Sequence, residues 1–276
     1  MTAPLVLRAA NLAAVPGVAH GFSTRVRSAD RIDFDLRARP EAPEHCAADR
    51  GAFLAACGLS GAALVTLGQT HEDRIFEVEG GEPLPSVPPA GFDAVVVSGA
   101  GVAVAVGTAD CLPILIADRR GAVVAAVHAG WRSSALGLPA RVVRLLTESY
   151  GVDPSELSVA MGPAIGPCCF EVGEEVVDAL ESRIGEPASW TLRQEGRKPH
   201  VDLAHANSRA LAAAGVRIDA IERMPGCTMC EAERFFSFRR EGAATGRQLS
   251  AIGLVAAAGA GSGSARPWPS ASSTSA

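Results

Sequence analysis

Apolar runs rich in β-branched residues recur along the chain and are separated by Gly, Asp and Pro. Runs of about four to eight such residues between turn-forming residues are typical of buried strands. The strands predicted in this way are ALVTLGQ, DAVVVS, GVAVAVG, LPILIAD, AVVAAVH and LSVAMGP. Most of them lie in the first half of the chain, which is therefore predicted to be rich in strands.

Helical spacing of apolar residues is clearer in four other segments. They are AADRGAFLAACGL, SALGLPARVVRLLTESYG, EVGEEVVDALESRI and VDLAHANSRALAAAGV. The last segment opens with Asp202 near an N-cap position and closes at Gly215, two residue types that commonly begin and end helices. We therefore predict four helices, interspersed with the strands rather than in strict alternation with them.

This mixture indicates the α+β class (mixed α/β), with layers that contain mixed sheets. No fixed-period repeat and no linker is found before residue 255, so a single domain over residues 1–255 is predicted. Residues 256–276 are rich in Ala, Gly, Ser and Pro and carry too little apolar surface to offset the entropy of ordering. We expect a disordered tail there.

Charge and composition narrow the classes of partner. The 276 residues carry a formal net charge of -5, which argues against nucleic acid as a partner, because nucleic-acid binding needs clustered cations. Lys198 is the only lysine, which leaves no Gly-Lys-Ser/Thr phosphate loop and makes Schiff-base catalysis a poor interpretation. A small molecule is therefore the expected substrate.

Cellular location is predicted from the apolar segments and the cysteines. No apolar run reaches the roughly 18 to 20 residues of a membrane span, and the N-terminal segment lacks a basic start followed by an unbroken apolar run. The seven cysteines are an odd number in a chain too long to need disulfide bonds for its stability, so reduced thiols are expected. We predict a cytoplasmic protein without a membrane partner; the oligomeric state is left open.

Three residues that commonly bind metals stand at the ends of predicted strands. They are His71, Cys111 and His128. If these strands share a sheet, their ends are neighbours, and the two imidazoles and one thiolate suit a tetrahedral zinc with a fourth position for water. A packed or surface role for each residue is the alternative. Asp110 beside Cys111 is a candidate proton shuttle or a hydrogen-bond acceptor within such a site.

The segment HAGWRSSALGL begins at His128, the last residue of the predicted strand AVVAAVH. Ser133 or Ser134 is expected to cap the helix that follows, and a helix start with Arg132 is a possible site for phosphate or carboxylate. A capped helix with a solvated arginine is the equally supported alternative.

The remaining cysteines and a late aromatic segment give weaker signals. Cys168 and Cys169 lie in a Gly/Pro turn before a helix and are interpreted as structural, whereas Cys227 and Cys230 form one C-x-x-C, which falls short of a zinc ribbon and equally suits a redox pair. The segment ERFFSFRREGAATGRQ is predicted either to line a pocket or to form a packed strand. Among its arginines are Arg239, Arg240 and Arg247.

Six motifs occur in a familiar order: HGFSTR, GQTH, GTADCLPILI, HAGWR, GPAIGPCCFEVG and GCTMCEAERFFSFRREGAATGRQ. Together they resemble the laccase-domain family, also called multicopper polyphenol oxidoreductase, whose bacterial members are described as purine nucleoside phosphorylases and peptidoglycan editing factors. The resemblance implies a layered αββα sandwich and a zinc bound by His71, Cys111 and His128. It also implies phosphorolysis of adenosine, inosine, guanosine and S-methyl-5'-thioadenosine, with hydrolytic deamination of adenosine.

One segment departs from the pattern of that family. The family usually follows the arginine of HGFSTR with Gly-Gly-Val-Ser and Ser-Leu-Asn, whereas this chain reads VRSADRIDFDLRARPEAPEHC after Arg25. We expect Arg25 and Arg132 to bind phosphate, and the altered loop to change specificity or turnover if it touches the substrate.

Three other functions stay open from the sequence. Cys111 could act as a thiolate nucleophile with His128 or His71 as its base, as in a cysteine hydrolase. Copper could occupy the same ligands and oxidise polyphenols, although the six histidines are too few for a multinuclear oxidase. An editing factor would act on a UDP-linked muramyl precursor that carries the wrong amino acid.

Overall fold

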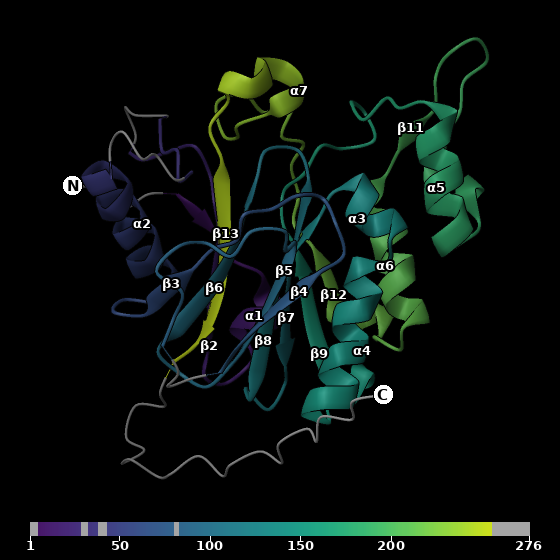
Figure 1. The fold of residues 1–276 in the computed structure, drawn as a ribbon. Helices are drawn as coiled ribbons and strands as arrows, with labels where there is room; N and C mark the ends of the chain where they lie inside the picture. The colour runs from purple at the N-terminus through teal and green to yellow at the C-terminus, as the bar shows by residue number, and fades with distance from the viewer. Residues whose placement is uncertain (1–4, 29–32, 38–42, 80–82, 256–276) are drawn as a thin grey trace.

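Two mixed β-sheets pack face to face and are covered on their outer sides by helices (Figure 1). The computed structural model describes residues 5–28, 33–37, 43–79 and 83–255; the predicted tail, 256–276, lies outside the described residues. The layered αββα arrangement and the mixed sheets expected from the sequence are confirmed.

The first sheet has the strand order β1-β2-β13-β6-β3. Its strands are β1 (Val6–Leu7), β2 (Val18–Ser23), β13 (Gln248–Leu254), β6 (Val102–Thr108) and β3 (Ala63–Val65). The last strand in the chain, β13, lies antiparallel between β2 and β6, so the C-terminal part of the sequence completes the centre of a sheet that the N-terminal part begins. Helix α2 (Pro43–Cys57) packs on the outer face of this sheet through Phe53 and Leu54.

The second sheet has the strand order β12-β9-β7-β8-β5-β4. Its strands are β12 (Ile221–Arg223), β9 (Leu157–Met161), β7 (Leu112–Asp118), β8 (Val123–Ala129), β5 (Ala94–Ser98) and β4 (Ile75–Glu79). Every residue of β7 and of β8 is buried, since one face meets the first sheet and the other meets helices. That double burial is why both strands are continuous apolar runs rather than alternating ones.

The helices α3 (Trp131–Ala135), α4 (Leu138–Tyr150), α5 (Glu174–Ile184) and α6 (Leu203–Ala213) lie on the side of the second sheet (Figure 1). Asp202 accepts a hydrogen bond from the backbone amide of His205 at 2.8 Å, which confirms the predicted start of α6. None of the helices in the described ranges is both long enough and apolar enough to span a bilayer.

The single helix predicted over residues 134–151 is wrong in one respect. The chain forms two helices, α3 and α4, because Gly137 between them adopts a left-handed conformation with φ of 78° and Pro139 favours a new first turn. The predicted caps are wrong as well, since Ser133 and Ser134 lie inside α3 and are buried while Gly130 occupies the N-cap position.

Two short helices and a two-stranded hairpin lie outside these layers. They are the N-terminal α1 (Ala10–Ala13), the hairpin β10 (Thr191–Leu192) with β11 (His200–Val201), and α7 (Phe238–Glu241). The segment around α7 was predicted either to line a pocket or to form a packed strand. It is a short helix followed by a 3-10 turn, with the strand β13 beginning only at Gln248.

Candidate metal centre

His71, Cys111 and His128 converge at one end of the sandwich. The Sγ atom of Cys111 lies 3.7 Å from the Nε2 atom of His71, and the two imidazole rings lie edge to face with centroids 4.8 Å apart. One potential ligand atom from each residue lies within 4.8 Å of the others. The structure thus brings together the three residues that the sequence singled out, in a cluster compatible with a bound metal ion.

The three predicted strands do not share one sheet, which was the condition given above for their ends to be neighbours. His71 lies on the connection from β3 of the first sheet to β4 of the second, whereas His128 belongs to β8 of the second sheet. Cys111 lies on the turn between β6 and β7, where the chain crosses from one sheet to the other. The site is therefore gathered across the interface between the sheets, and its geometry depends on how they pack.

Asp93, which the sequence analysis overlooked, fixes two of these residues at once. Its carboxylate lies 2.7 Å from the Nδ1 atom of His128 and is fully buried. It also accepts hydrogen bonds from the backbone amides of Thr70, His71 and Glu72, at 3.1, 3.0 and 2.8 Å. A carboxylate bound to Nδ1 leaves Nε2 of the same ring for a metal, and this arrangement recurs in proteins whose histidines bind zinc.

Two residues of the site have backbone conformations that side chains rarely adopt. His71 has φ of 64° and Asp110 has φ of 91°. The amides that Asp93 holds keep the turn at His71 in place. Asp110 is held through its carboxylate, which accepts hydrogen bonds from the Oγ1 atom of Thr228 and the backbone amide of Arg239, both at 2.6 Å. Strained residues held by their surroundings often mark functional sites.

The charge states of the cluster suit a metal ligand set. Burial alone would raise the pKa of Cys111, but the neighbouring His128 and His71 lower it to about 6. Burial would lower the pKa of His128, whereas the Cys111 thiolate and Asp93 raise it to about 9. Near neutral pH the metal-free pair is therefore a thiolate beside an imidazolium, and a metal cation would replace the imidazolium proton.

The donor set and its spacing fit zinc. With zinc–sulfur and zinc–nitrogen bonds of about 2.3 and 2.0 Å, tetrahedral geometry places a sulfur and a nitrogen ligand about 3.6 Å apart. The 3.7 Å between the Sγ atom of Cys111 and the Nε2 atom of His71 agrees with that value. A Cβ atom added at Gly130 would lie 3.0 Å from the Cδ2 atom of His71 and 3.2 Å from the Cys111 sulfur, so the site also needs a glycine beside it.

A cavity of about 650 Å³ opens beside this cluster, and its volume suits a ligand of nucleoside size. The ligand residues and Asp110 line it together with Trp131, Ile165, Phe170 and Phe238. Its cationic lining is formed by Arg37, Arg50, Arg132, Arg239 and Arg247. Apolar and aromatic walls with several guanidinium groups indicate a ligand that has a flat apolar part and an anionic part.

The two arginines predicted to bind phosphate lie in different places. Arg132 lines this cavity, and its guanidinium stacks on the Trp131 ring at 4.3 Å. Arg25 lines a neighbouring cavity of about 300 Å³, where its Nη1 atom donates to Glu241 at 2.9 Å. Arg239 and Arg247, named in the sequence only as members of a motif, contribute to the metal-side cavity instead.

The segment that departs from the family pattern forms part of the cavity wall. Leu36 and Arg37 line the cavity, and the buried Asp35 accepts a hydrogen bond from the backbone amide of Arg247 at 2.9 Å. The altered segment therefore touches the place where a ligand would bind, although residues 29–32 and 38–42 of it lie outside the described residues.

The fold and the site together define a class: a layered α+β sandwich with a Cys/His cluster that can hold a metal beside an arginine-lined cavity for a small molecule. Residues 19–255 match the model of the family described as multi-copper polyphenol oxidoreductase laccase. The chain belongs to this family.

Relatives with curated names are enzymes of nucleoside metabolism. The chain is 36% identical over 262 residues to the purine nucleoside phosphorylase of Deinococcus radiodurans, covering 92% of this chain and 95% of that protein. It is 38% identical to adenosine deaminase RL5 of an unknown prokaryotic organism, over 59% of this chain and 62% of that protein. The crystal structure of YlmD from Geobacillus stearothermophilus superposes with a TM-score of 0.83 at 29% identity, covering 93% of this chain and 98% of YlmD.

Proposed function

We propose that this chain is a zinc-dependent purine nucleoside enzyme, which splits adenosine, inosine, guanosine and S-methyl-5'-thioadenosine with phosphate and also deaminates adenosine to inosine. The observation that carries the proposal is the convergence of His71, Cys111 and His128 on a cavity with both aromatic and guanidinium walls. The names of the relatives, purine nucleoside phosphorylase and adenosine deaminase, support it.

In the proposed complex, the three ligand residues hold zinc, with Asp93 orienting His128. When bound, zinc supplies a Lewis acid and lowers the pKa of a water molecule toward neutrality. Cys111 suits the role of zinc ligand as a thiolate, because the neighbouring histidines lower the pKa of its thiol to about 6 despite the opposing effect of burial.

Phosphorolysis breaks the bond between the purine nitrogen and the C1' atom of the ribose, and a phosphate oxygen forms the new bond to C1'. The aromatic residues Trp131, Phe170 and Phe238 supply flat surfaces for the purine. Arg132 and Arg247 bind the phosphate and offset its charge as it approaches the sugar. Arg25 belongs to the adjacent cavity, which shares the lining residue Arg37 with this one.

Asp110 is the proposed proton-transfer group. It lines the cavity beside Cys111, and each of its carboxylate oxygens accepts one hydrogen bond from the protein while retaining a further lone pair. In deamination a water oxygen replaces the amino group at C6 of adenine and ammonia leaves, so one group must accept a proton and return it to the leaving nitrogen.

The test is a product assay on zinc-replete protein. Incubation with adenosine and phosphate should yield adenine with ribose 1-phosphate, and without phosphate it should yield inosine. His71→Ala should lose zinc and both activities together, whereas His45→Ala on the exposed side of α2 should retain both. Absence of adenine and inosine from a sample that contains one zinc at this site would refute the proposal.

A second candidate is a cysteine hydrolase in which Cys111 attacks a carbonyl. The thiolate of Cys111 and the neighbouring imidazoles favour it, because the same geometry activates a nucleophile. An activated ester would test it in metal-free protein. Acylation of Cys111 with release of the alcohol, followed by slow hydrolysis of the thioester, would support this candidate. Carbonyl hydrolysis that Cys111→Ser retains at the wild-type rate would refute this second candidate.

A further inference from the structure

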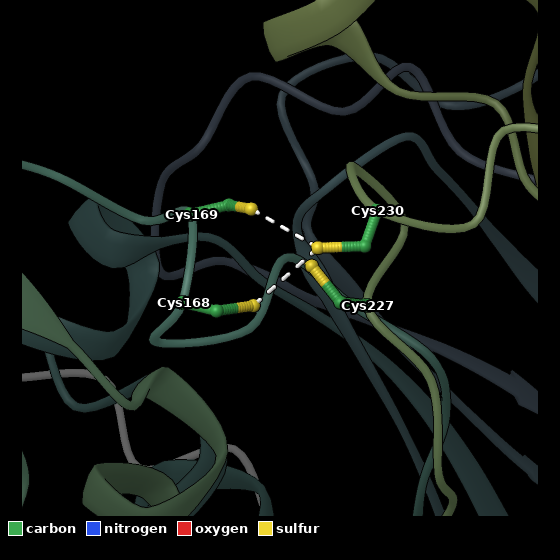
Figure 2. Close-up of side chains that lie close together, drawn as sticks. All are labelled: Cys168, Cys169, Cys227 and Cys230. Atoms are coloured by element: carbon green, nitrogen blue, oxygen red, sulfur yellow. Dashed lines mark hydrogen bonds between the residues drawn. The ribbon is translucent and has the colours of Figure 1, made fainter.

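Four cysteines outside the site described above form a second cluster (Figure 2). Cys168 and Cys169 lie on the turn before Phe170, and Cys227 and Cys230 lie on the turn after β12. The sulfur atoms of all four lie within 4.8 Å of one another, although the two pairs are far apart in the sequence. Two cysteines are too few for a closed four-ligand metal site, and only the tertiary structure brings the two pairs together.

The spacing of the sulfur atoms is that of a shared ligand set. The Sγ atom of Cys230 lies 3.3 Å from that of Cys169 and 3.6 Å from that of Cys168. A tetrahedral zinc with bonds of about 2.3 Å to sulfur separates its thiolates by about 3.8 Å. One sulfur with two sulfur neighbours at similar distances matches four ligands around one ion better than it matches a single disulfide-forming pair.

The backbone around the cluster donates hydrogen bonds to sulfur. The amide of Gly166 lies 3.2 Å from the Sγ atom of Cys227, and the amide of Cys230 donates to the same atom. Donation from the fourth residue of a C-x-x-C turn to its first sulfur stabilises the thiolate form that metals require. A Cβ atom at Gly166 would lie 3.4 Å from the Cβ atom and 3.5 Å from the sulfur of Cys227, so the two turns pack in direct contact here.

Positive charge lies next to both cysteine turns. The guanidinium of Arg239 donates to the carbonyl oxygens of Cys169 and Glu171, and that of Arg240 donates to those of Thr228 and Met229. Four thiolates around a divalent cation carry a net charge of about -2, which neighbouring guanidinium groups partly offset.

We propose that Cys168, Cys169, Cys227 and Cys230 bind a second metal ion, zinc, as a structural tetrathiolate site separate from the His71–Cys111–His128 centre. Four sulfur ligands select zinc among the common divalent ions of cells, and a site closed by four protein ligands is structural rather than catalytic. The proposal does not depend on the nucleoside activity.

The second site would act on the cavity through the turns that it joins. Thr228 lies between Cys227 and Cys230 and donates to Asp110 at 2.6 Å, while Phe170 directly follows Cys169 and lines the cavity. Fixing the two turns to each other therefore fixes Asp110 and one aromatic wall. Loss of the ion should weaken substrate binding without removing the metal at His71.

Metal analysis of the purified full-length protein tests this proposal. Wild type should contain about two zinc ions per chain, and Cys227→Ser/Cys230→Ser and His71→Ala should each contain about one. Cys46→Ser is the matched control, because this half-buried thiol of α2 belongs to neither cluster and should leave both ions in place.

X-ray absorption of the zinc in His71→Ala keeps the proposal testable if the double cysteine variant does not fold. Only sulfur neighbours at about 2.3 Å should surround the remaining ion. One zinc in wild type that the double cysteine variant retains would overturn the proposal, as would nitrogen ligands on the ion left in His71→Ala. A disulfide between any two of the four cysteines, found in wild type purified under reducing conditions, would also overturn it.

Discussion

At the scale of single residues, Asp93 organises the metal centre. A single buried carboxylate orients His128 and holds the left-handed turn at His71, so one side chain sets two of the three ligands. Burial opposes its ionisation, but the hydrogen bond from His128 and the amides of the turn lower the pKa of Asp93 to about 2. The group therefore stays ionised throughout the pH range in which zinc binds.

Asp93→Asn tests this role. The amide keeps the size of the side chain but removes its charge and one acceptor, so zinc affinity should fall by about 10- to 100-fold. Competition with a chromophoric chelator at pH 7.5 measures the affinity. Asp118→Asn is the control, because Asp118 is also fully buried but binds Arg120 at the far end of β7. Equal zinc affinities for wild type and Asp93→Asn would contradict the role of the carboxylate.

At the scale of elements, β2 and α1 are joined by a histidine that stays neutral. The Nε2 atom of the buried His20 accepts a hydrogen bond from the backbone amide of Ala9 at 2.9 Å, directly before α1. Burial, together with the nearby charge of Arg8, lowers the pKa of His20 to about 4. The attachment of the N-terminal element therefore depends on pH.

The sign of this dependence follows from proton binding. His20 has a pKa of 6.5 in the unfolded chain and of about 4 in the folded protein. Between these two pH values the unfolded chain binds a proton that the folded protein excludes, so the free energy of unfolding decreases as the pH falls from 6.5 to about 4. His20→Gln keeps an acceptor for the Ala9 amide but cannot titrate. Between pH 7 and 4 wild type should lose about 3 kcal/mol more of its free energy of unfolding than this variant.

Urea unfolding followed by tryptophan fluorescence at several pH values measures the difference between the two proteins. The comparison cancels the pH dependence that the other titrating groups share. His45→Gln is the control, since this histidine is exposed on α2 and its variant should follow the wild-type profile. Parallel profiles for wild type and His20→Gln would show that His20 is protonated in the folded state.

At the scale of the whole molecule, the metal centre links the two sheets. His71 and Cys111 lie on the two segments where the chain crosses from the first sheet to the second, between β3 and β4 and between β6 and β7, and His128 belongs to β8 of the second sheet. A metal that binds all three adds its binding free energy to the folded state alone, because the unfolded chain has no such site.

Thermal unfolding with and without a chelator tests this link. Wild type should have a higher Tm than His71→Ala when zinc is present, and the difference should largely vanish when a chelator removes zinc from both. Differential scanning calorimetry measures it, with magnesium added in place of zinc as the control, since magnesium prefers oxygen ligands. If the Tm difference persists unchanged in the presence of the chelator, the lower Tm of His71→Ala results from altered packing at position 71 rather than from loss of the metal.

The local pattern of apolar and polar residues was enough to predict several strands, the start of one helix and the residues of the candidate metal site. The apolar runs predicted four of the six strands of the second sheet but only β3 and β6 of the five strands of the first. Asp202 marked the start of α6, and ordered motifs singled out His71, Cys111 and His128. The strand predictions and the predicted start of α6 succeeded because strand burial and helix capping depend on residues close in sequence. The break at Gly137 was missed, because a glycine within a helical pattern is often tolerated and its left-handed conformation is visible only in the fold.

Only the tertiary structure decided which of the reactive and metal-binding residues lie together in one site. Asp93 is the first residue of the predicted strand DAVVVS, and only the pairing of β5 with β8 places it against His128. Cys168 and Cys169 likewise meet Cys227 and Cys230 only where two distant turns lie side by side. A sequence determines which residues are buried and which can bind metals, whereas packing between distant segments determines which of them share a site, because ligand geometry is a property of three-dimensional distances.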